Sequence, residues 1–220
     1  MRTVKVKICG ITSIEALKLV CDIGADAVGF IVGVPSSPRN LSIDKAKQLF
    51  KLVPIFVKSV LVVVPQRVSE VLRLCRILKP DIVQIHGEKL PDISALKEKL
   101  PDIPLVRAVT VKSAAAFDIA IKESKFFDAV LLDSSSSGKF GGTGLTHDWS
   151  ISKRIRKAIH PKPLILAGGL TPENVREAIQ TVKPYAVDVS TGVESKPGVK
   201  DPRKVAAFIR NAKEPVINDD

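Results

Sequence analysis

Short apolar runs rich in β-branched residues alternate along the chain with longer segments in which apolar residues recur every three or four positions. Runs of the first kind predict buried strands, and segments of the second kind predict amphipathic helices. Eight runs are expected to be strands, at residues 4–8, 27–31, 56–63, 82–85, 105–108, 129–132, 164–167 and 186–189. Strands separated by helical segments in this way are typical of parallel βαβ units.

Several of the intervening segments begin with helix-start signals. Thr12 followed by Glu15 forms a capping-box pattern. Ser42 opens a second helix, and Thr171 before Pro172 places a cap residue ahead of a proline at the first helical position. Apolar stripes mark two further helices, at Val68, Val71, Leu72, Cys75 and Leu78 and at Val205, Phe208 and Ile209. The segment 113–125 is also predicted to be helical, although its periodicity is the weakest.

Eight strand–helix units within 220 residues favour a closed barrel over an open sheet. An open doubly wound sheet usually has about five or six strands, whereas a TIM barrel has eight. No linker or shift in composition divides the chain. We therefore expect an α/β protein with one (β/α)8 TIM-barrel domain at residues 1–213, followed by a short polar tail at residues 214–220.

The composition places the chain among cytoplasmic proteins that do not enter membranes. No apolar run reaches the roughly 18–20 residues that span a bilayer, and the first residues lack the apolar centre of a signal peptide. The cysteines, Cys9, Cys21 and Cys75, are three in number and widely spaced. That spacing predicts neither a disulfide framework nor a metal site.

The net charge of +11 raises the question of a nucleic-acid partner. Lys and Arg are scattered over all the predicted helices, aromatic residues are only 5% of the chain, and no nucleic-acid-binding motif occurs. A basic surface that attracts a small anion explains the charge equally well. We therefore expect a small phosphorylated molecule as the partner, and no nucleic acid.

Glycine-rich loops follow the last three predicted strands. In a TIM barrel the active site lies at the carboxyl ends of the strands, and phosphate is often held near strands seven and eight. Glycine lets backbone N–H groups approach an anion, and a helix N-terminus beyond the loop adds partial positive charge. The alternative is that the glycines only form tight turns, but three neighbouring loops favour phosphate. The predicted phosphate-binding residues are Gly142, Thr143, Gly144, Gly168, Gly169, Ser190, Thr191 and Gly192.

Cys9 and Asp133 follow the first and sixth predicted strands, on roughly opposite sides of the barrel mouth. Such a pair can flank a bound sugar, with one group removing a proton and the other donating one. A cysteine base requires a pKa lowered towards neutrality, which a nearby cation or helix dipole can provide. From sequence chemistry alone, Cys9 is better explained as a small packed residue, and a cap of the following loop is an alternative role for Asp133.

Motifs in order along residues 4–210 resemble those of the phosphoribosylanthranilate isomerases of tryptophan biosynthesis. They include VKICGIT at 6–12, SPR at 37–39, VQIHG at 83–87, LLDS at 131–134, GGTG at 141–144, LAGGL at 166–170 and VDVSTGVE at 187–194. The resemblance implies a (β/α)8 barrel that converts N-(5-phosphoribosyl)anthranilate to 1-(2-carboxyphenylamino)-1-deoxyribulose 5-phosphate. This aldose–ketose isomerisation is an Amadori rearrangement, and it needs neither metal nor organic cofactor.

The resemblance also assigns roles to residues. Asp133 is expected to be the general acid and Cys9 the general base. Arg39 is expected to face the anthranilate carboxylate. Gln84, His86 and Asp188 are expected to contact the sugar or the bridging nitrogen, although a structural role for His86 stays open.

Two alternatives remain beside this interpretation. The isomerase of histidine biosynthesis performs the same chemistry on another substrate, but it is expected to carry an aspartate where this chain has Cys9. A catalytically silent barrel that binds phosphate or nucleic acid is disfavoured by the joint presence of Cys9, Asp133 and Arg39. The family contains both monomers and homodimers, and the sequence does not choose between them.

Overall fold

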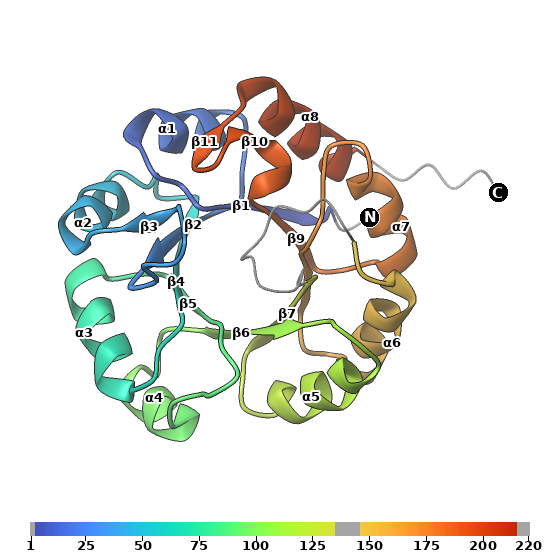
Figure 1. Ribbon diagram of the computed structural model, residues 1–220, viewed down its shortest axis with the longest axis horizontal. Coiled ribbons are helices and arrows are strands. Elements are labelled where there is room, and N and C mark those ends of the chain that lie inside the picture. The colour runs from blue at the N-terminus through green and yellow to red at the C-terminus, as the bar shows by residue number, and fades with distance from the viewer. Residues whose placement is uncertain (1–2, 135–145, 215–220) are drawn as a thin grey trace.

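Eight parallel strands close into a barrel in the computed structural model, which describes residues 3–134 and 146–214 (Figure 1). All eight predicted strands are confirmed, with ends that shift by two residues at most. The barrel strands are β1 (Lys5–Cys9), β2 (Ala27–Val32), β4 (Lys58–Val63), β5 (Ile82–Ile85), β6 (Leu105–Thr110), β7 (Ala129–Asp133), β8 (Leu164–Leu166) and β9 (Ala186–Val189).

The barrel closes through β1, which pairs with β2 on one side and with β9 on the other. In this register Cys9 lies beside Gly29 of β2, and Lys7 lies beside Asp188 of β9. The predicted (β/α)8 fold is therefore confirmed. Three short strands were not expected: β3 (Asn40–Leu41), which pairs with β2, and the antiparallel pair β10 (Glu194–Lys196) and β11 (Val199–Lys200).

Helices form a ring outside the barrel (Figure 1). They are α1 (Ile14–Asp22), α2 (Ile43–Lys51), α3 (Val68–Leu78), α4 (Ile93–Lys99), α5 (Ala115–Ser124), α6 (Trp149–Ile159), α7 (Val175–Val182) and α8 (Pro202–Lys213). The segment with the weakest periodicity does form α5. Of the predicted tail, Glu214 is described and residues 215–220 lie outside the described residues.

Two of the predicted helix starts are wrong. Ser13, not Thr12, caps α1 and accepts a hydrogen bond from Ala16 N, while the Thr12 hydroxyl donates to Gly198 O. The helix expected to start at Thr171-Pro172 starts at Val175, because the Asn174 side chain accepts a hydrogen bond from Thr171 N and donates one to Gly169 O. These two bonds hold the preceding residues as a turn.

The pleat of each strand divides the core into two layers, since successive side chains point to opposite faces. On β7, Val130 and Leu132 belong to the large cluster between the barrel and its helices. Ala129 and Leu131, which alternate with them, pack in a smaller cluster with residues of neighbouring strands. The helices contribute apolar stripes to the outer layer, such as Leu17 and Val20 of α1. The inner face is thereby left to the small clusters and to the polar residues of the site.

Aspartates stabilise the amino-terminal ends of three strands. Asp26, Asp81 and Asp128 directly precede β2, β5 and β7. Each accepts a hydrogen bond from a backbone N–H of the adjacent strand, at 2.9, 2.8 and 2.9 Å respectively. Each also pairs with a lysine, at 2.9, 3.0 and 2.9 Å. This face of the barrel therefore uses its carboxylates to fix strands to one another.

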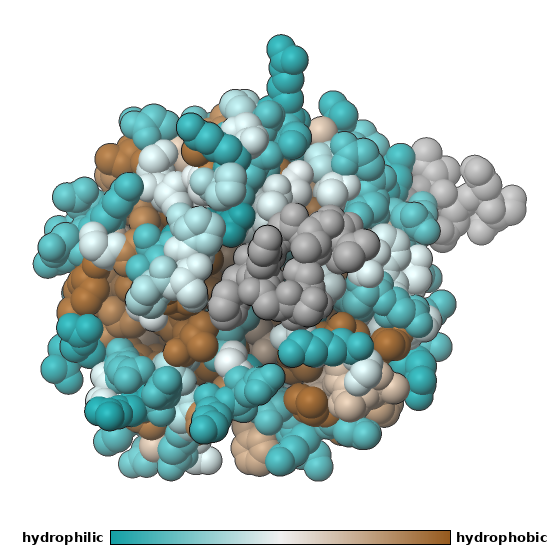
Figure 2. Space-filling model, in the orientation of Figure 1, coloured by the Kyte–Doolittle hydropathy of each residue, from teal (hydrophilic) through white to brown (hydrophobic). Residues whose placement is uncertain are grey.

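The molecular surface seen in the same orientation is polar around its edge, with an apolar area over β3 and the neighbouring strands (Figure 2). None of the helices in the described part of the chain is long and apolar enough to cross a membrane.

Candidate active site

A cavity of about 1160 Å³ opens at the carboxyl ends of the strands. Most of the predicted site residues line it, namely Cys9, Arg39, Gln84, His86, Asp133, Gly168, Gly169, Asp188, Ser190, Thr191 and Gly192. The remaining three, Gly142, Thr143 and Gly144, lie outside the described residues. The fold thus brings together residues that are far apart in the sequence; Cys9 and Gly192, for example, are 183 positions apart.

Asp133 is the last residue of β7. Burial, and after it the nearby charge of Asp188, raise the pKa of its carboxyl group, while Lys7 and a backbone hydrogen bond from Ser134 lower it. The net effect is a pKa of about 7. A carboxyl group with such a pKa holds a proton over much of the neutral range. Asp133 is therefore suited to donate a proton to a bound molecule.

Gly168 makes room for Asp133. A Cβ at this position would lie 2.8 Å from the Asp133 carboxyl oxygen Oδ1 and would also collide with the backbone and hydroxyl of Ser134. The φ angle of Gly168 is +82°, a conformation that residues with a Cβ rarely adopt. The glycine predicted for phosphate binding is thus also required for the position of the acid.

Cys9 is the last residue of β1 and is 7% exposed. The expected lowering of its pKa is wrong as a net effect, because burial raises the pKa of the thiol more than the neighbouring cations lower it. The cations are nevertheless present: Lys7 and Lys200 both act to lower the pKa of Cys9, while Asp188 raises it. The site therefore provides a cationic surrounding for a thiolate inside an apolar wall.

Gln84 and His86 contact each other at the end of β5, with the Gln84 side-chain nitrogen 2.7 Å from Nε2 of His86. Since the amide nitrogen donates, Nε2 accepts, and the neutral ring carries its proton on Nδ1. Burial, together with the charges of Lys7 and Arg107, lowers the pKa of His86 to about 4. His86 is therefore a neutral group of the site that is held in place by Gln84.

Asp188 of β9 pairs with Lys7 of β1 inside the barrel, with 2.8 Å between Lys7 Nζ and Asp188 Oδ2. The two side chains are 6% and 8% exposed. The other carboxylate oxygen, Oδ1, is buried and has no hydrogen-bond partner within residues 3–134 and 146–214. Because Asp188 also lines the cavity, this oxygen is an acceptor for a hydroxyl or N–H group of a bound molecule.

Arg39 has a partner within the protein that the sequence did not predict. Its Nε and Nη2 atoms donate to the two carboxylate oxygens of Glu194 at 2.8 and 2.6 Å, and Nη2 also donates to Thr191 Oγ1 at 3.1 Å. Lys200 Nζ donates to the same carboxylate at 2.8 Å and to Ser190 O at 3.1 Å. This buried cluster fixes the loop after β9 and keeps a guanidinium group at the cavity wall.

The predicted phosphate loops after β8 and β9 lie together at the cavity. Gly168 and Gly169 have φ angles of +82° and +65°. Because α7 begins only at Val175, the loop between them and the helix is longer than predicted. After β9, Ser190 precedes a single 3-10 turn at Thr191–Val193.

The sequence interpretation missed two buried cations: Arg107, which lines the cavity, and Lys7, which pairs with Asp188. Arg107 of β6 donates to the carbonyl oxygens of Ala108 and Gly87, at 2.8 and 2.9 Å, and more weakly to Ile85 at 3.3 Å. Arg107 interrupts the apolar run of a predicted inner strand, which was a signal that could have identified it. Lys7 alternates with apolar residues, a pattern that also fits a side chain exposed to solvent.

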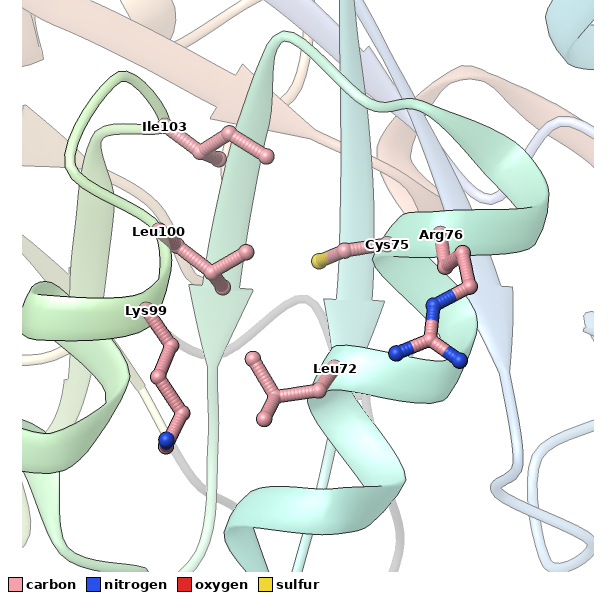
Figure 3. A pocket seen from close by; sticks show the side chains of 6 residues that line it. All are labelled: Leu72, Cys75, Arg76, Lys99, Leu100 and Ile103. Atoms are coloured by element: carbon pink, nitrogen blue, oxygen red, sulfur yellow. The ribbon is translucent and has the colours of Figure 1, made fainter.

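A second, smaller groove of about 450 Å³ lies on the outside of the barrel between α3 and α4. Figure 3 shows Cys75 and Leu72 of α3 facing Leu100 and Ile103, which follow α4, while Lys99 lies at the edge. None of the predicted site residues lines this groove. In the described part of the chain no cluster of three or more His, Cys, Asp or Glu residues is arranged to hold a metal ion.

The family model of N-(5′-phosphoribosyl)anthranilate isomerase matches residues 6–211. The chain belongs to this family. A relative from Methanothrix thermoacetophila with the same name is 45% identical over 95% of this chain and 98% of its own length. The dimeric isomerase of Thermotoga maritima, solved as engineered monomers, has a TM-score of 0.82 at 37% identity and covers 96% of this chain and 98% of its own.

A further solved isomerase of the family has a TM-score of 0.81 at 37% identity, over 96% of this chain and 98% of that one. It was crystallised with reduced 1-(o-carboxyphenylamino)-1-deoxyribulose 5-phosphate. The family expected from the motifs is therefore confirmed, and the chain is an isomerase of tryptophan biosynthesis with a (β/α)8 barrel.

Proposed function

We propose that this isomerase converts N-(5′-phosphoribosyl)anthranilate to 1-(2-carboxyphenylamino)-1-deoxyribulose 5-phosphate, with Asp133 as general acid and Cys9 as general base. The assignment rests on one observation: an acidic and a thiol side chain, from different strands, line the same cavity. Asp133 ends β7 and Cys9 ends β1, both line one cavity, and the pKa of Asp133 is raised to about 7. An acid and a base on separate strands can act on different atoms of one sugar.

The reaction proceeds through two proton transfers by the protein, followed by a tautomerisation. Asp133 donates its proton to the ring oxygen of the ribose, the bond between this oxygen and C1′ breaks, and the nitrogen lone pair forms a C1′=N Schiff base. Cys9 then removes the proton from C2′, and the electrons of that bond form an enolamine. Tautomerisation of the enolamine gives the C2′ ketone and a C1′ methylene group. No electron is gained or lost overall.

The remaining residues hold the substrate. Arg39 presents a buried guanidinium at the cavity wall, where it attracts the anthranilate carboxylate. The backbone N–H groups of Gly168, Gly169 and the loop at 190–192 receive the phosphate. Asp188 accepts from a sugar hydroxyl or the bridging nitrogen through its Oδ1 atom, which has no hydrogen-bond partner among the described residues. His86 and Gln84 contact the same part of the substrate from β5.

The test is a coupled assay in which phosphoribosylanthranilate is generated in situ and the loss of its fluorescence is followed. We expect rapid loss with the wild-type protein, and a decrease in kcat of about 10²–10⁴-fold for Cys9→Ala. Cys75→Ala is the matched control, because Cys75 of α3 is buried in the outer layer and is not among the residues that line the cavity.

Wild-type-like turnover by Cys9→Ala would remove Cys9 from the mechanism. No turnover by folded wild-type protein would contradict the proposed substrate. The same assay with the phosphoribosyl substrate of the histidine-pathway isomerase would then test the main alternative.

We also propose that the protein works as a homodimer. Ile55 and Phe56, between α2 and β4, are 90% and 94% exposed, which is unusual for two adjacent large apolar residues. The similar isomerase of Thermotoga maritima is described as dimeric. Sedimentation of the wild-type protein should give twice the chain mass of 23.8 kDa, and Phe56→Glu should shift it to the single mass. A single-chain mass for the wild type would reject the proposal.

We place the reaction in the cytoplasm, because a Cys9 thiolate has to remain reduced to act as a base. All three cysteines are free thiols. Fractionation of the native cell, with detection of the protein by antibody, tests this location.

A further inference from the structure

We propose that Lys7 is a positioning residue for the base: its ammonium group, held by Asp188, stabilises the thiolate form of Cys9. The inference rests on the proposed role of Cys9 as the base. It concerns a residue that contacts no reacting atom in the mechanism given above and that acts through its neighbour.

The pleat of β1 places Lys7 and Cys9 on the same inner face. They are two positions apart, and the residues that alternate with them, Val6 and Ile8, are fully buried in the outer layer beneath the helices. Lys7 is itself only 5% exposed. Its side chain is therefore confined to the barrel interior and extends towards the end of the strand where Cys9 lies.

Gly29 shows how close the two side chains are. It lies beside Cys9 in the pairing of β1 with β2. A Cβ on Gly29 would be 2.7 Å from the sulfur of Cys9 and 3.1 Å from Cε of Lys7. The thiol and the end of the lysine side chain thus pack on the same glycine, and a larger residue there would displace both.

Four charged groups face the Cys9 thiol. Lys7 from the same strand and Lys200 from β11 favour the thiolate, and Asp188 from β9 opposes it. Arg39, from the loop before β3, also interacts electrostatically with the thiol. Lys200 and Arg39 are both paired with Glu194, whose negative charge offsets theirs. Among these cations, the strongest influence on the thiol comes from Lys7.

The ion pair of Lys7 with Asp188 fixes the ammonium group at 2.8 Å from Oδ2. Although burial alone would lower the pKa of Lys7, the charges of Asp188 and Cys9 raise it above its ordinary value. The lysine therefore stays charged inside the barrel. Buried ion pairs add little to stability, and apolar replacements are often neutral or stabilising. Stability therefore gives no reason for a charged pair at this position, whereas a functional role of Lys7 does.

The experiment measures the thiolate of Cys9 directly. In a Cys21→Ser/Cys75→Ser background, Cys9 is the only cysteine, and its thiolate is titrated by ultraviolet absorbance, with Cys9→Ala as the blank for Tyr185. Lys7→Met keeps the length of the side chain and removes its charge, and Lys7→Arg keeps the charge. We expect the titration of Cys9 in Lys7→Met to move upward by at least one pH unit, and that in Lys7→Arg to stay near the wild-type value.

Kinetics provide the second readout. Since turnover requires protonated Asp133 and ionised Cys9 together, the maximum of kcat/KM should fall about tenfold for each unit by which the thiol titration rises. The alkaline limb of the pH profile should move upward by the same amount. A purely structural defect would lower the rate at every pH and leave this limb in place.

An unchanged Cys9 titration in Lys7→Met would overturn the proposal. If the unpaired charge of Asp188 prevents Lys7→Met from folding, the double variant Lys7→Met/Asp188→Asn removes both charges. The titration of Cys9 in that variant then reports the effect of losing the whole Lys7–Asp188 ion pair. The absorbance titration needs no substrate. A failure of the proposed substrate in the coupled assay is therefore distinguishable from a failure of this inference.

Discussion

The two ends of the barrel use the same residue type in opposite ways. At the amino-terminal end, Asp26, Asp81 and Asp128 each pair with a lysine and a backbone N–H, and the pKa of each carboxyl group is lowered. At the carboxyl end, Asp133 is partly buried at the wall of the cavity, near the charge of Asp188, and its pKa is raised to about 7. The carboxylates of the first end are ionised and stabilise the fold. The carboxyl group of the second end keeps a proton available for chemistry.

This comparison shows how the barrel separates stability from activity. An ionised carboxylate with strong partners lowers the free energy of the folded state but gives up no proton near neutral pH. A carboxyl group with a raised pKa can give up a proton near neutral pH but does not stabilise the fold there, since ionising it in the folded state costs free energy. Substitutions at the carboxyl end should therefore change mainly activity, and those at the amino-terminal end mainly stability.

The largest effect is expected from Asp133→Asn, which should reduce kcat by about 10²–10⁴-fold because the amide has no proton to donate. The same variant should be more stable than the wild type at pH 8, by on the order of 2 kcal/mol, since the cost of a buried carboxylate disappears. This corresponds to a rise in Tm of roughly 4–8 °C, measured by calorimetry. Lower stability together with full activity would contradict the assignment of Asp133 to the acid.

The pH dependence should follow Asp133. Its folded pKa of about 7 lies above the ordinary value of 3.8, so the folded state binds more protons than the unfolded state between these two values. The stability contributed by this group is therefore full at low pH and is lost as the pH rises towards 7. The fraction of active acid also falls above pH 7. A rate profile without a titration near pH 7 would contradict this.

A medium effect is expected at the other end of the barrel. Asp81→Ala removes the hydrogen bonds to Ser59 N and Ser59 Oγ and should destabilise the fold by about 1–2 kcal/mol. Denaturation by urea measures the change, with Asp102→Ala, at an exposed loop position, as the control. Turnover at 25 °C should remain unchanged. A loss of turnover without a loss of stability would mean that the two ends are not independent.

The smallest effect is expected from Lys58→Ala. The ion pair with Asp81 is 3.0 Å long, but the lysine side chain is 63% exposed. Exposed pairs contribute roughly 0–1 kcal/mol, and salt screens them. We therefore expect a loss of less than about 0.5 kcal/mol in urea denaturation, and no loss at high salt. A loss as large as that of Asp81→Ala would mean that the lysine, and not the backbone bond, holds the strand.

Much of the fold could be predicted because its signals are local. Each strand is a short apolar run, and eight such runs within one chain favour a closed barrel. The helix starts at Thr12 and Thr171 were wrong because the side chains of nearby polar residues make the local hydrogen bonds instead. Ser13 Oγ accepts from Ala16 N, and Asn174 Oδ1 accepts from Thr171 N. The choice between such neighbours depends on the path of the loop, which the sequence pattern does not specify.

The motif resemblance predicted which residues gather at the site, but not the contacts that these residues make with one another. Cys9 and Asp133 were predicted to line one cavity, and they do. The pairing of Arg39 with Glu194 and the buried position of Lys7 depend on contacts between distant segments, 155 and 181 residues apart. The net effect of burial on the Cys9 pKa likewise depends on the packed surroundings. No spacing along the chain reports these contacts.

The most direct test of the contrast between the two ends is a titration of the aspartate side chains by NMR, with carbon-13 labelled carboxyl groups. The Asp133 signal is identified by its absence in Asp133→Asn, and those of Asp26, Asp81 and Asp128 by the corresponding asparagine variants. The account predicts that Asp133 titrates with a midpoint near pH 7 and that the other three titrate below their ordinary value of 3.8. An Asp133 signal that titrates together with the other three would contradict the account.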